Sequence, residues 1–190
     1  MNPLILASAS PRRRALLAEH GYQFTVAPAA VTEVAPSHLT PAETVLWNAR
    51  LKASAIARTQ PDAILLGVDT LVALGSHLLG KPTDLDDAFA MLRTLNGIAH
   101  EVFTGVCLLA PARERSFVEV TRVHFHRRTD ADLRAYLARI GPLDEAGAYA
   151  AQDDAGGMIA RVEGSFTNVI GLPMKTLARE LAALAHPAHV

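Results

Sequence analysis

The segment Ser8-Ala9-Ser10-Pro11-Arg12-Arg13 combines residue types that hold an anion. It follows a short apolar run, and Ser10 and Pro11 are typical of the N-cap and the first position of a helix. Free backbone N–H groups and the positive end of the helix dipole meet at a helix N-terminus, which therefore binds phosphate groups. Two hydroxyl and two guanidinium groups add donors of matching geometry. We predict an anion site here, although the Walker P-loop pattern is missing; the alternative is a capped helix with exposed arginines.

Asp69 interrupts a run of apolar residues from Ala63 to Leu74. A continuous apolar run is typical of a central strand. Burying a carboxylate costs free energy unless the group is paired or binds a metal ion. We therefore predict a functional carboxylate at Asp69; the alternative is an aspartate that caps a turn at a strand end.

Two lysines and one glutamate are weaker candidates. Lys52 falls on the apolar face of a helix predicted over residues 40–58, so its amine reaches either solvent or a polar site beside the core. Lys81 precedes Pro82, which favours an extended backbone and a rigid loop. Glu33 lies in a predicted loop. Taken alone, Lys81 and Glu33 are ordinary surface residues.

The remaining reactive side chains indicate structural roles. The eight histidines show no close metal-ligand spacing. We expect His100 to be a hydrogen-bonded structural residue, and His124 and His126 to lie on a solvated sheet face. Cys107 lies among apolar neighbours and is expected to be a buried thiol.

We call the predicted anion site at residues 8–13 the anion cradle. Together with the candidate cations Lys52 and Lys81 and the candidate carboxylates Glu33 and Asp69, it suits phosphoryl chemistry. In such sites Arg and Lys hold phosphates, while carboxylates hold Mg²⁺ and orient a water molecule. These residue types do not choose which bond is cleaved.

The elements that position these residues follow from the hydrophobic periodicity. Strands are predicted over residues 4–7, 22–27, 63–74, 100–109, 117–126 and 158–162, and helices over 10–20, 40–58, 84–95, 129–140 and 173–185. The turn-like segment 111–115 joins two strands into a hairpin, and the Gly-rich segment 141–157 is expected to be irregular. The mixture predicts an α/β or α+β fold with a mixed sheet flanked by helices.

The composition excludes several classes of protein. The chain has 190 residues, 50% of them hydrophobic, and a formal net charge of −1. This balance argues against intrinsic disorder and against a nucleic-acid binder. The single cysteine excludes an intramolecular disulfide and a cysteine-based zinc site, and no apolar run approaches the roughly 20 residues of a membrane helix. We expect one domain over residues 1–190 in the cytoplasm, with no membrane or nucleic-acid partner.

Short motifs follow one another along nearly the whole chain. They are Ser8-x-Ser10-Pro11-Arg12-Arg13, Glu33, Lys52-Ala53, Asp69-Thr70, Gly80-Lys81-Pro82, Leu95-x-Gly97-x-x-His100-x-Val102-x-Thr104-Gly105-Val106, Asp144-x-Ala146-Gly147-Ala148-Tyr149-x-x-Gln152 and Gly164-Ser165-x-x-Asn168-Val169-x-Gly171-Leu172-Pro173. Each motif is weak alone, but their joint order and spacing are specific. In this order and spacing the chain resembles the Maf family of nucleoside triphosphate pyrophosphatases.

The resemblance implies a reaction, a fold and an assembly. The reaction is hydrolysis of a nucleoside triphosphate to the monophosphate and pyrophosphate with a divalent metal, Mg²⁺ or Mn²⁺, in the housecleaning of nucleotides. The fold is a mixed α/β one, similar to that of inosine triphosphate pyrophosphatases, with two lobes and a central cleft. The assembly is a homodimer.

The resemblance also implies roles for individual residues. Asp69, Glu33 and Lys52 are the catalytic set, in which Glu33 and Asp69 bind metal or activate water and Asp69 is the preferred general base. The phosphates are held by Ser8, Ser10, Arg12, Arg13, Lys52 and Lys81. Thr70 and Gln152 help to recognise the base and position the substrate.

Within the family, the chain most resembles the dTTP/UTP branch. The residues that indicate this branch are Arg12 directly after the proline, Asp69-Thr70 and Ala148-Tyr149-x-x-Gln152. One position departs from the family pattern: Glu145 stands where the family usually has a lysine. If that side chain approaches the triphosphate, Glu145 repels it; if it lies on the surface, nothing changes. The following segment 150–154 is also more acidic than usual.

Alternative functions come from two classes. A 7-methyl-GTP or inosine-type triphosphate pyrophosphatase shares the reaction but has a different base pocket. A non-catalytic nucleotide-binding regulator of cell division would bind nucleotide without turnover. A nucleic-acid binder is disfavoured by the near-zero net charge.

Overall fold

The computed structural model describes residues 2–152 and 157–185, and within these ranges seven strands form one mixed sheet. The strand order is β2-β1-β3-β5-β6-β7, with β4 paired to β3. The parallel pairs are β1 with β2 and β1 with β3, and the other pairs are antiparallel. The strands are β1 (Leu4–Leu6), β2 (Phe24–Val26), β3 (Ile64–Leu74), β4 (His77–Leu79), β5 (Ala99–Ala110), β6 (Arg113–Phe125) and β7 (Ile159–Glu163).

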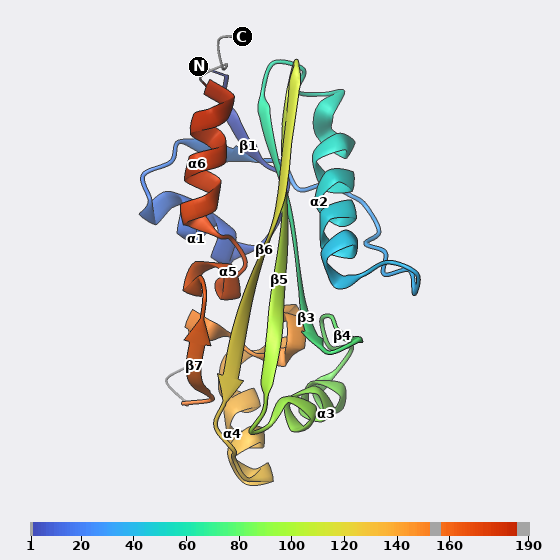
Figure 1. The fold of residues 1–190 in the computed structure, drawn as a ribbon, viewed down its shortest axis with the longest axis vertical. Helices are drawn as coiled ribbons and strands as arrows, with labels where there is room; N and C mark the ends of the chain where they lie inside the picture. The colour runs from blue at the N-terminus through green and yellow to red at the C-terminus, as the bar shows by residue number, and fades with distance from the viewer. Residues whose placement is uncertain (1, 153–156, 186–190) are drawn as a thin grey trace.

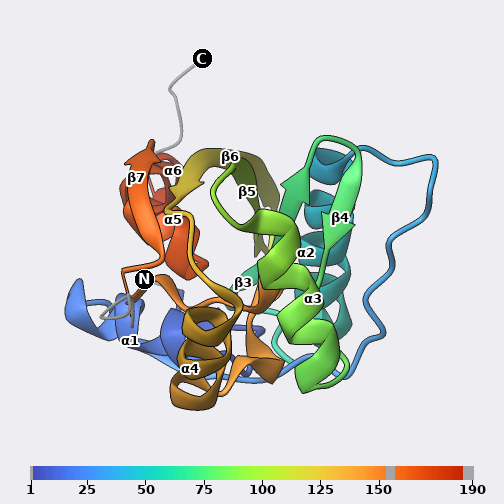
Figure 2. The same cartoon turned by 90° about the horizontal axis from the view of Figure 1, so that it is seen from below.

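Helices cover both faces of the sheet and one of its ends (Figure 1). They are α1 (Pro11–Glu19), α2 (Pro41–Ala57), α3 (Leu85–Leu95), α4 (Asp130–Ile140), α5 (Phe166–Ile170) and α6 (Met174–Ala185), with 3-10 turns η1 (Pro142–Asp144) and η2 (Ala146–Ala148). The long helix α2 packs on β3 and β5, whereas α6 packs on β6 from the other side. At the lower end, α3 and α4 lie side by side (Figure 2).

Local capping explains where the helices begin. The Thr40 hydroxyl accepts a hydrogen bond from the backbone N–H of Glu43, whose carboxylate accepts one from the backbone of Thr40. Thr129 and Asp132 form the same capping box at α4. Each box satisfies N–H groups that a first turn otherwise leaves without partners. These starts agree with the sequence prediction.

Buried residues form separate clusters at the two ends of the long strands. One cluster includes Leu66, Val68 and Val106 and joins the sheet to α6, which lies in the upper part of Figure 1. Another includes Val72 and Val102 from the same strands and joins them to α3 and α4, which lie in the lower part. The molecule thus has an upper and a lower lobe that share β3 and β5, and Asp69 and Thr70 lie on β3 where one cluster gives way to the other.

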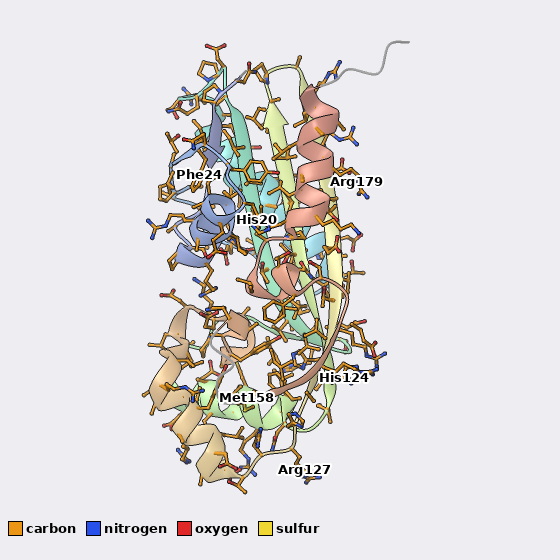
Figure 3. All side chains as sticks on the ribbon, turned by 90° about the vertical axis from the view of Figure 1, so that its left-hand side faces the viewer. His20, Phe24, His124, Arg127, Met158 and Arg179 are labelled. Carbon is orange, nitrogen blue, oxygen red and sulfur yellow. The ribbon has the colours of Figure 1, made fainter. Side chains whose placement is uncertain are left out.

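The side view of Figure 3 shows the same division. His20 and Phe24 lie beside the upper part of the sheet, and Arg127 and Met158 lie in the lower lobe near α4. The mixed sheet, the flanking helices and the two lobes confirm the fold class predicted from the sequence.

Two glycines let α2 lie unusually close to the sheet. A Cβ added at Gly67 would lie 2.0 Å from the backbone oxygen of Ala49, and one added at Gly105 would lie 2.5 Å from that of Val45. No side chain fits in either space, so both positions require glycine. The close approach brings the inner face of α2 within reach of Asp69.

Three elements differ from the sequence prediction. The second hairpin strand, β6, begins inside the predicted turn 111–115, so the turn contracts to residues 111–112. The short strand β4 and the five-residue helix α5 were not predicted, because elements this short have too few residues to show a period. The described part of the Gly-rich segment contains η1 and η2, while residues 153–156 lie outside the described residues. Of the helices described, none is long and apolar enough to cross a membrane.

Candidate active site

A cavity of about 330 Å³ opens between the two lobes. Its lining contains nine of the ten site residues predicted from the sequence, namely Ser8, Ser10, Arg12, Arg13, Glu33, Lys52, Asp69, Thr70 and Lys81. The tenth, Gln152, is exposed and is not among the lining residues. The cavity therefore joins the N-terminal anion cradle to the two carboxylates.

Lys52 joins the two carboxylates at the base of the cavity. Its Nζ lies 2.7 Å from Oδ1 of Asp69 and 2.6 Å from Oε1 of Glu33, and it donates to the backbone oxygen of Val68 at 3.1 Å. Lys52 and Asp69 are buried, whereas the Glu33 side chain is 51% exposed. We call Lys52, Asp69 and Glu33 the floor triad. Of the two readings left open for Lys52, the structure shows the polar site beside the core.

The floor triad favours the ionised form of Glu33. Partial burial opposes ionisation, but the hydrogen bond and the charge of Lys52 outweigh it, with smaller contributions from Lys81 and Arg13. Together they hold the pKa of Glu33 below its ordinary value. Glu33 therefore carries a negative charge at neutral pH.

Arg13 connects α1 to β3 and to the end of α5. It donates from Nη1 to Oγ of Ser8 at 2.9 Å, from Nη2 to Oγ1 of Thr70 at 3.0 Å, and from Nε to the backbone oxygen of Gly171 at 3.0 Å. Desolvation lowers the pKa of Arg13 to about 10, with Arg12 adding to that effect and Asp69 and Glu33 opposing it, so the group stays charged at neutral pH. Most of its donors already have partners, so Arg13 holds the cradle together.

The other two cations pair with carboxylates from the lower lobe. Arg12 forms an ion pair with Glu145 and donates from Nη2 to the backbone oxygen of Asp144 at 3.1 Å. Nζ of Lys81 lies 3.2 Å from Oδ1 of Asp144. We call these two contacts the rim pairs. Glu145 is buried and lines the cavity. The alternative in which Glu145 lies on the surface, away from the triphosphate, is therefore wrong.

Polar pairs also fix the wall beneath the cavity. The Thr70 and Thr104 hydroxyls lie 3.0 Å apart. His100 is buried, with Nε2 3.0 Å from the hydroxyl of Tyr149, which lines the cavity. Burial, with a smaller effect of His124, lowers the pKa of His100 to about 4. His100 is thus a neutral structural residue, as predicted, and Cys107 is the buried thiol expected.

Sequence reasoning missed Asn48, which lies one turn before Lys52 on α2. Its side chain donates from Nδ2 to Oδ2 of Asp69 at 3.0 Å. A polar residue four positions from Lys52 on an apolar helix face was the available signal.

The carboxylates suit a hard divalent cation. Within the described residues no group of three or more His, Cys, Asp or Glu side chains forms a ready metal cage. Mg²⁺ is commonly bound through one or two carboxylates together with substrate phosphates and water. Asp69 and Glu33, brought together by Lys52 in a cavity that also holds the anion cradle, fit that requirement.

Comparison with known proteins places the chain in a family. The sequence model of the family described as Maf-like protein matches residues 3–184. The chain belongs to the Maf family. Among similar Maf relatives is the dTTP/UTP pyrophosphatase of Pelotomaculum thermopropionicum, 44% identical over 180 residues that cover 94% of each chain. The dTTP/UTP pyrophosphatase of Exiguobacterium sibiricum is 43% identical over 96% of this chain and 92% of its own.

A solved structure extends the likeness to the fold. The Maf chain described here is similar to the Ham1 protein of Staphylococcus aureus, with a TM-score of 0.54 over 96% of this chain and 100% of that one. The sequence identity is 13%, so this likeness concerns the fold alone.

Proposed function

We propose that this chain hydrolyses dTTP and UTP to the nucleoside monophosphate and pyrophosphate. The observation that carries the proposal is the floor triad, which opens into the same cavity as the N-terminal anion cradle. The relatives named dTTP/UTP pyrophosphatase, 44% and 43% identical, support the choice of substrate. The matched range 3–184 also supports a single domain.

The triphosphate binds across the mouth of the cavity. Ser8, Ser10 and the first N–H groups of α1 donate to phosphate oxygens, and Arg12 and Lys81 supply mobile positive charge from the rim. Arg13 supports the site indirectly, because its hydrogen bonds hold Ser8 and Thr70 in place. Thr70 positions the substrate beside the floor triad, and Gln152 contributes to base recognition.

The floor triad then carries the chemistry. Asp69 accepts a proton from a water molecule, whose oxygen forms a bond to the α-phosphorus while the bond to the pyrophosphate oxygen breaks. Lys52 orients Asp69 through its 2.7 Å contact. Glu33 and Asp69 would hold Mg²⁺ or Mn²⁺, which supplies charge neutralisation for the phosphates and makes water more acidic. A homodimer in the cytoplasm completes the proposal, and light scattering on the purified protein tests the dimer.

A product assay tests the function. Purified protein with Mg²⁺ is given dTTP, UTP, CTP, 7-methyl-GTP and ITP separately, and monophosphate, pyrophosphate and phosphate are resolved. We expect monophosphate plus pyrophosphate from dTTP and UTP, with the Asp69→Ala variant as the control for contaminating enzymes. If the same products form only from 7-methyl-GTP or ITP, the proposed reaction is supported but the proposed preference for thymine and uracil bases is wrong. Nucleotide binding without turnover would favour the regulator.

A further inference from the structure

Asn48 has each of its side-chain hydrogen-bonding groups engaged at the base of the cavity. Nδ2 donates to Oδ2 of Asp69 and to the backbone oxygen of Val34, both at 3.0 Å. Oδ1 accepts from the backbone N–H of Val34, also at 3.0 Å. The side chain is buried, on the face of α2 that Gly67 allows close to the sheet.

The contacts with Val34 fix the orientation of the amide. A backbone N–H only donates and a backbone carbonyl only accepts, so Oδ1 must face the former and Nδ2 the latter. The second hydrogen on Nδ2 is then directed to Asp69. In a flipped amide, Nδ2 would face the Val34 N–H, and Oδ1 would face both the Val34 carbonyl and Asp69, so one orientation is strongly favoured.

The same contacts join the two carboxylates of the floor triad. Val34 directly follows Glu33, in a stretch without regular secondary structure, so anchoring its backbone sets where the Glu33 side chain begins. Asp69 is held at both oxygens, Oδ1 by Lys52 and Oδ2 by Asn48. Lys52 offsets one of the two negative charges, while Asn48 adds no charge and can only set geometry.

We propose that Asn48 is a positioning residue that fixes Glu33 relative to Asp69 by clamping the backbone of Val34 to the carboxylate of Asp69. The proposal deepens, and rests on, the pyrophosphatase function proposed above. Partners that orient metal-binding or catalytic carboxylates typically change metal affinity or activity by about 10- to 100-fold when removed. The hydrogen bonds of the Asn48 side chain in the described part of the chain go to Val34 and Asp69 and not to the proposed phosphate-binding side chains, so the effect should fall on kcat and metal affinity, with KM for dTTP within about threefold of wild type.

Two variants and one control test the clamp. Asn48→Ala removes all three hydrogen bonds and keeps a good helix former. Asn48→Asp keeps the shape but sets a carboxylate against the Val34 carbonyl and Asp69. Thr44→Val is the matched control, because Thr44 is equally buried one turn earlier on α2 and its hydroxyl has no hydrogen-bond partner in the described part of the chain.

We expect Asn48→Ala to lower kcat and to weaken Mn²⁺ binding, each by about 10- to 100-fold, with Asn48→Asp lower still and Thr44→Val close to wild type. Mn²⁺ binding is measured without nucleotide, by calorimetry or electron paramagnetic resonance. A folded Asn48→Ala protein with kcat and Mn²⁺ affinity within about threefold of wild type would overturn the proposal, as would an equal loss in Thr44→Val.

Hydrogen exchange on the wild-type protein separates this proposal from the proposed function. The clamp predicts that the Val34 amide is protected from exchange, and that Asn48→Ala removes the protection. If no nucleoside triphosphate is hydrolysed, the function fails while protected Val34 and Asn48-dependent Mn²⁺ binding still support the clamp. Wild-type exchange at the rate of a free loop amide overturns the clamp even if the enzyme is active or a variant fails to fold.

Discussion

The floor triad and the rim pairs place similar ions on two sides of one cavity but hold them very differently. In the floor triad, Lys52 and Asp69 are buried and their atoms also bond to Asn48 and to the β3 backbone. Of the rim pairs, only the one between Lys81 and Asp144 is open to solvent, with side chains 57% and 85% exposed, whereas the side chains of Arg12 and Glu145 are 19% and 11% exposed. Exposed ion pairs contribute about 0–1 kcal/mol, whereas removing one partner of a buried pair costs several times more. The buried pair of the floor triad is therefore fixed, and the exposed pair of Lys81 with Asp144 is the one that most easily exchanges a carboxylate for a phosphate.

The largest expected effect is from Asp69→Ala. It removes the proposed base, and Glu33 remains to pair with Lys52, so the protein should stay folded. Turnover of dTTP should fall by about 10²- to 10⁴-fold, measured by pyrophosphate release with circular dichroism as the folding control. A folded variant with wild-type turnover would contradict the assignment of Asp69.

Lys52→Met tests whether the floor triad is a buried charge cluster. It leaves two neighbouring carboxylates without their cation, so the free energy of unfolding should fall by about 3 kcal/mol. Urea denaturation measures this, and Lys175→Met, at an exposed position on α6, is the charge-matched control. Equal unfolding free energies of the two variants would show that the ion pairs of the floor triad contribute as little to stability as an exposed ion pair.

Glu145→Gln breaks the more buried rim pair. In the free protein Glu145 competes with phosphate for Arg12, so its neutralisation should lower KM for dTTP by about fivefold, which corresponds to about 1 kcal/mol. Glu145→Lys, which restores the usual family residue, should lower KM further. Glu180→Gln is the control, since Glu180 pairs with Arg115 at similar burial. An unchanged KM would mean that Glu145 does not compete with the triphosphate, and a raised KM that it positions Arg12.

Asp144→Asn should have a smaller effect, because its pair with Lys81 is exposed. We expect KM to fall by less than about twofold at low salt. The difference should vanish near 1 M salt, where the screening length is about 3 Å. A difference that persists at high salt would place Asp144 with the buried groups.

The smallest expected effect is the pH dependence of the contribution of Glu33 to stability. Its pKa is depressed in the folded protein, so its stabilisation is present above the ordinary value of 4.5 and is lost as pH falls through the lower folded value. The difference in unfolding free energy between wild type and Glu33→Gln should therefore shrink as the pH falls below 4.5. A difference that grows on acidification would reverse the sign assigned to this group.

Local chemistry in the sequence predicted much of the fold and most of the candidate site. The Ser10-Pro11 helix start, the capping boxes and the apolar strand that contains Asp69 depend on neighbours a few residues apart, so they can be read without the structure. Nine of the ten site residues predicted from the sequence line one cavity. The short elements β4 and α5 were not predicted, although strands β1 and β2, of the same length as β4, were; in elements this short, tertiary contacts contribute more than local propensity.

The sequence by itself determined which groups carry charge and which helix start can bind an anion. Tertiary structure alone decided how those groups pair: Lys52 with both carboxylates, Arg13 with Ser8 and Thr70, and Arg12 with Glu145, 133 residues away. Such pairing depends on strand register and on how closely α2 approaches Gly67 and Gly105. These are distances of a few ångströms between segments far apart in the chain, and residue types and spacing do not encode them locally.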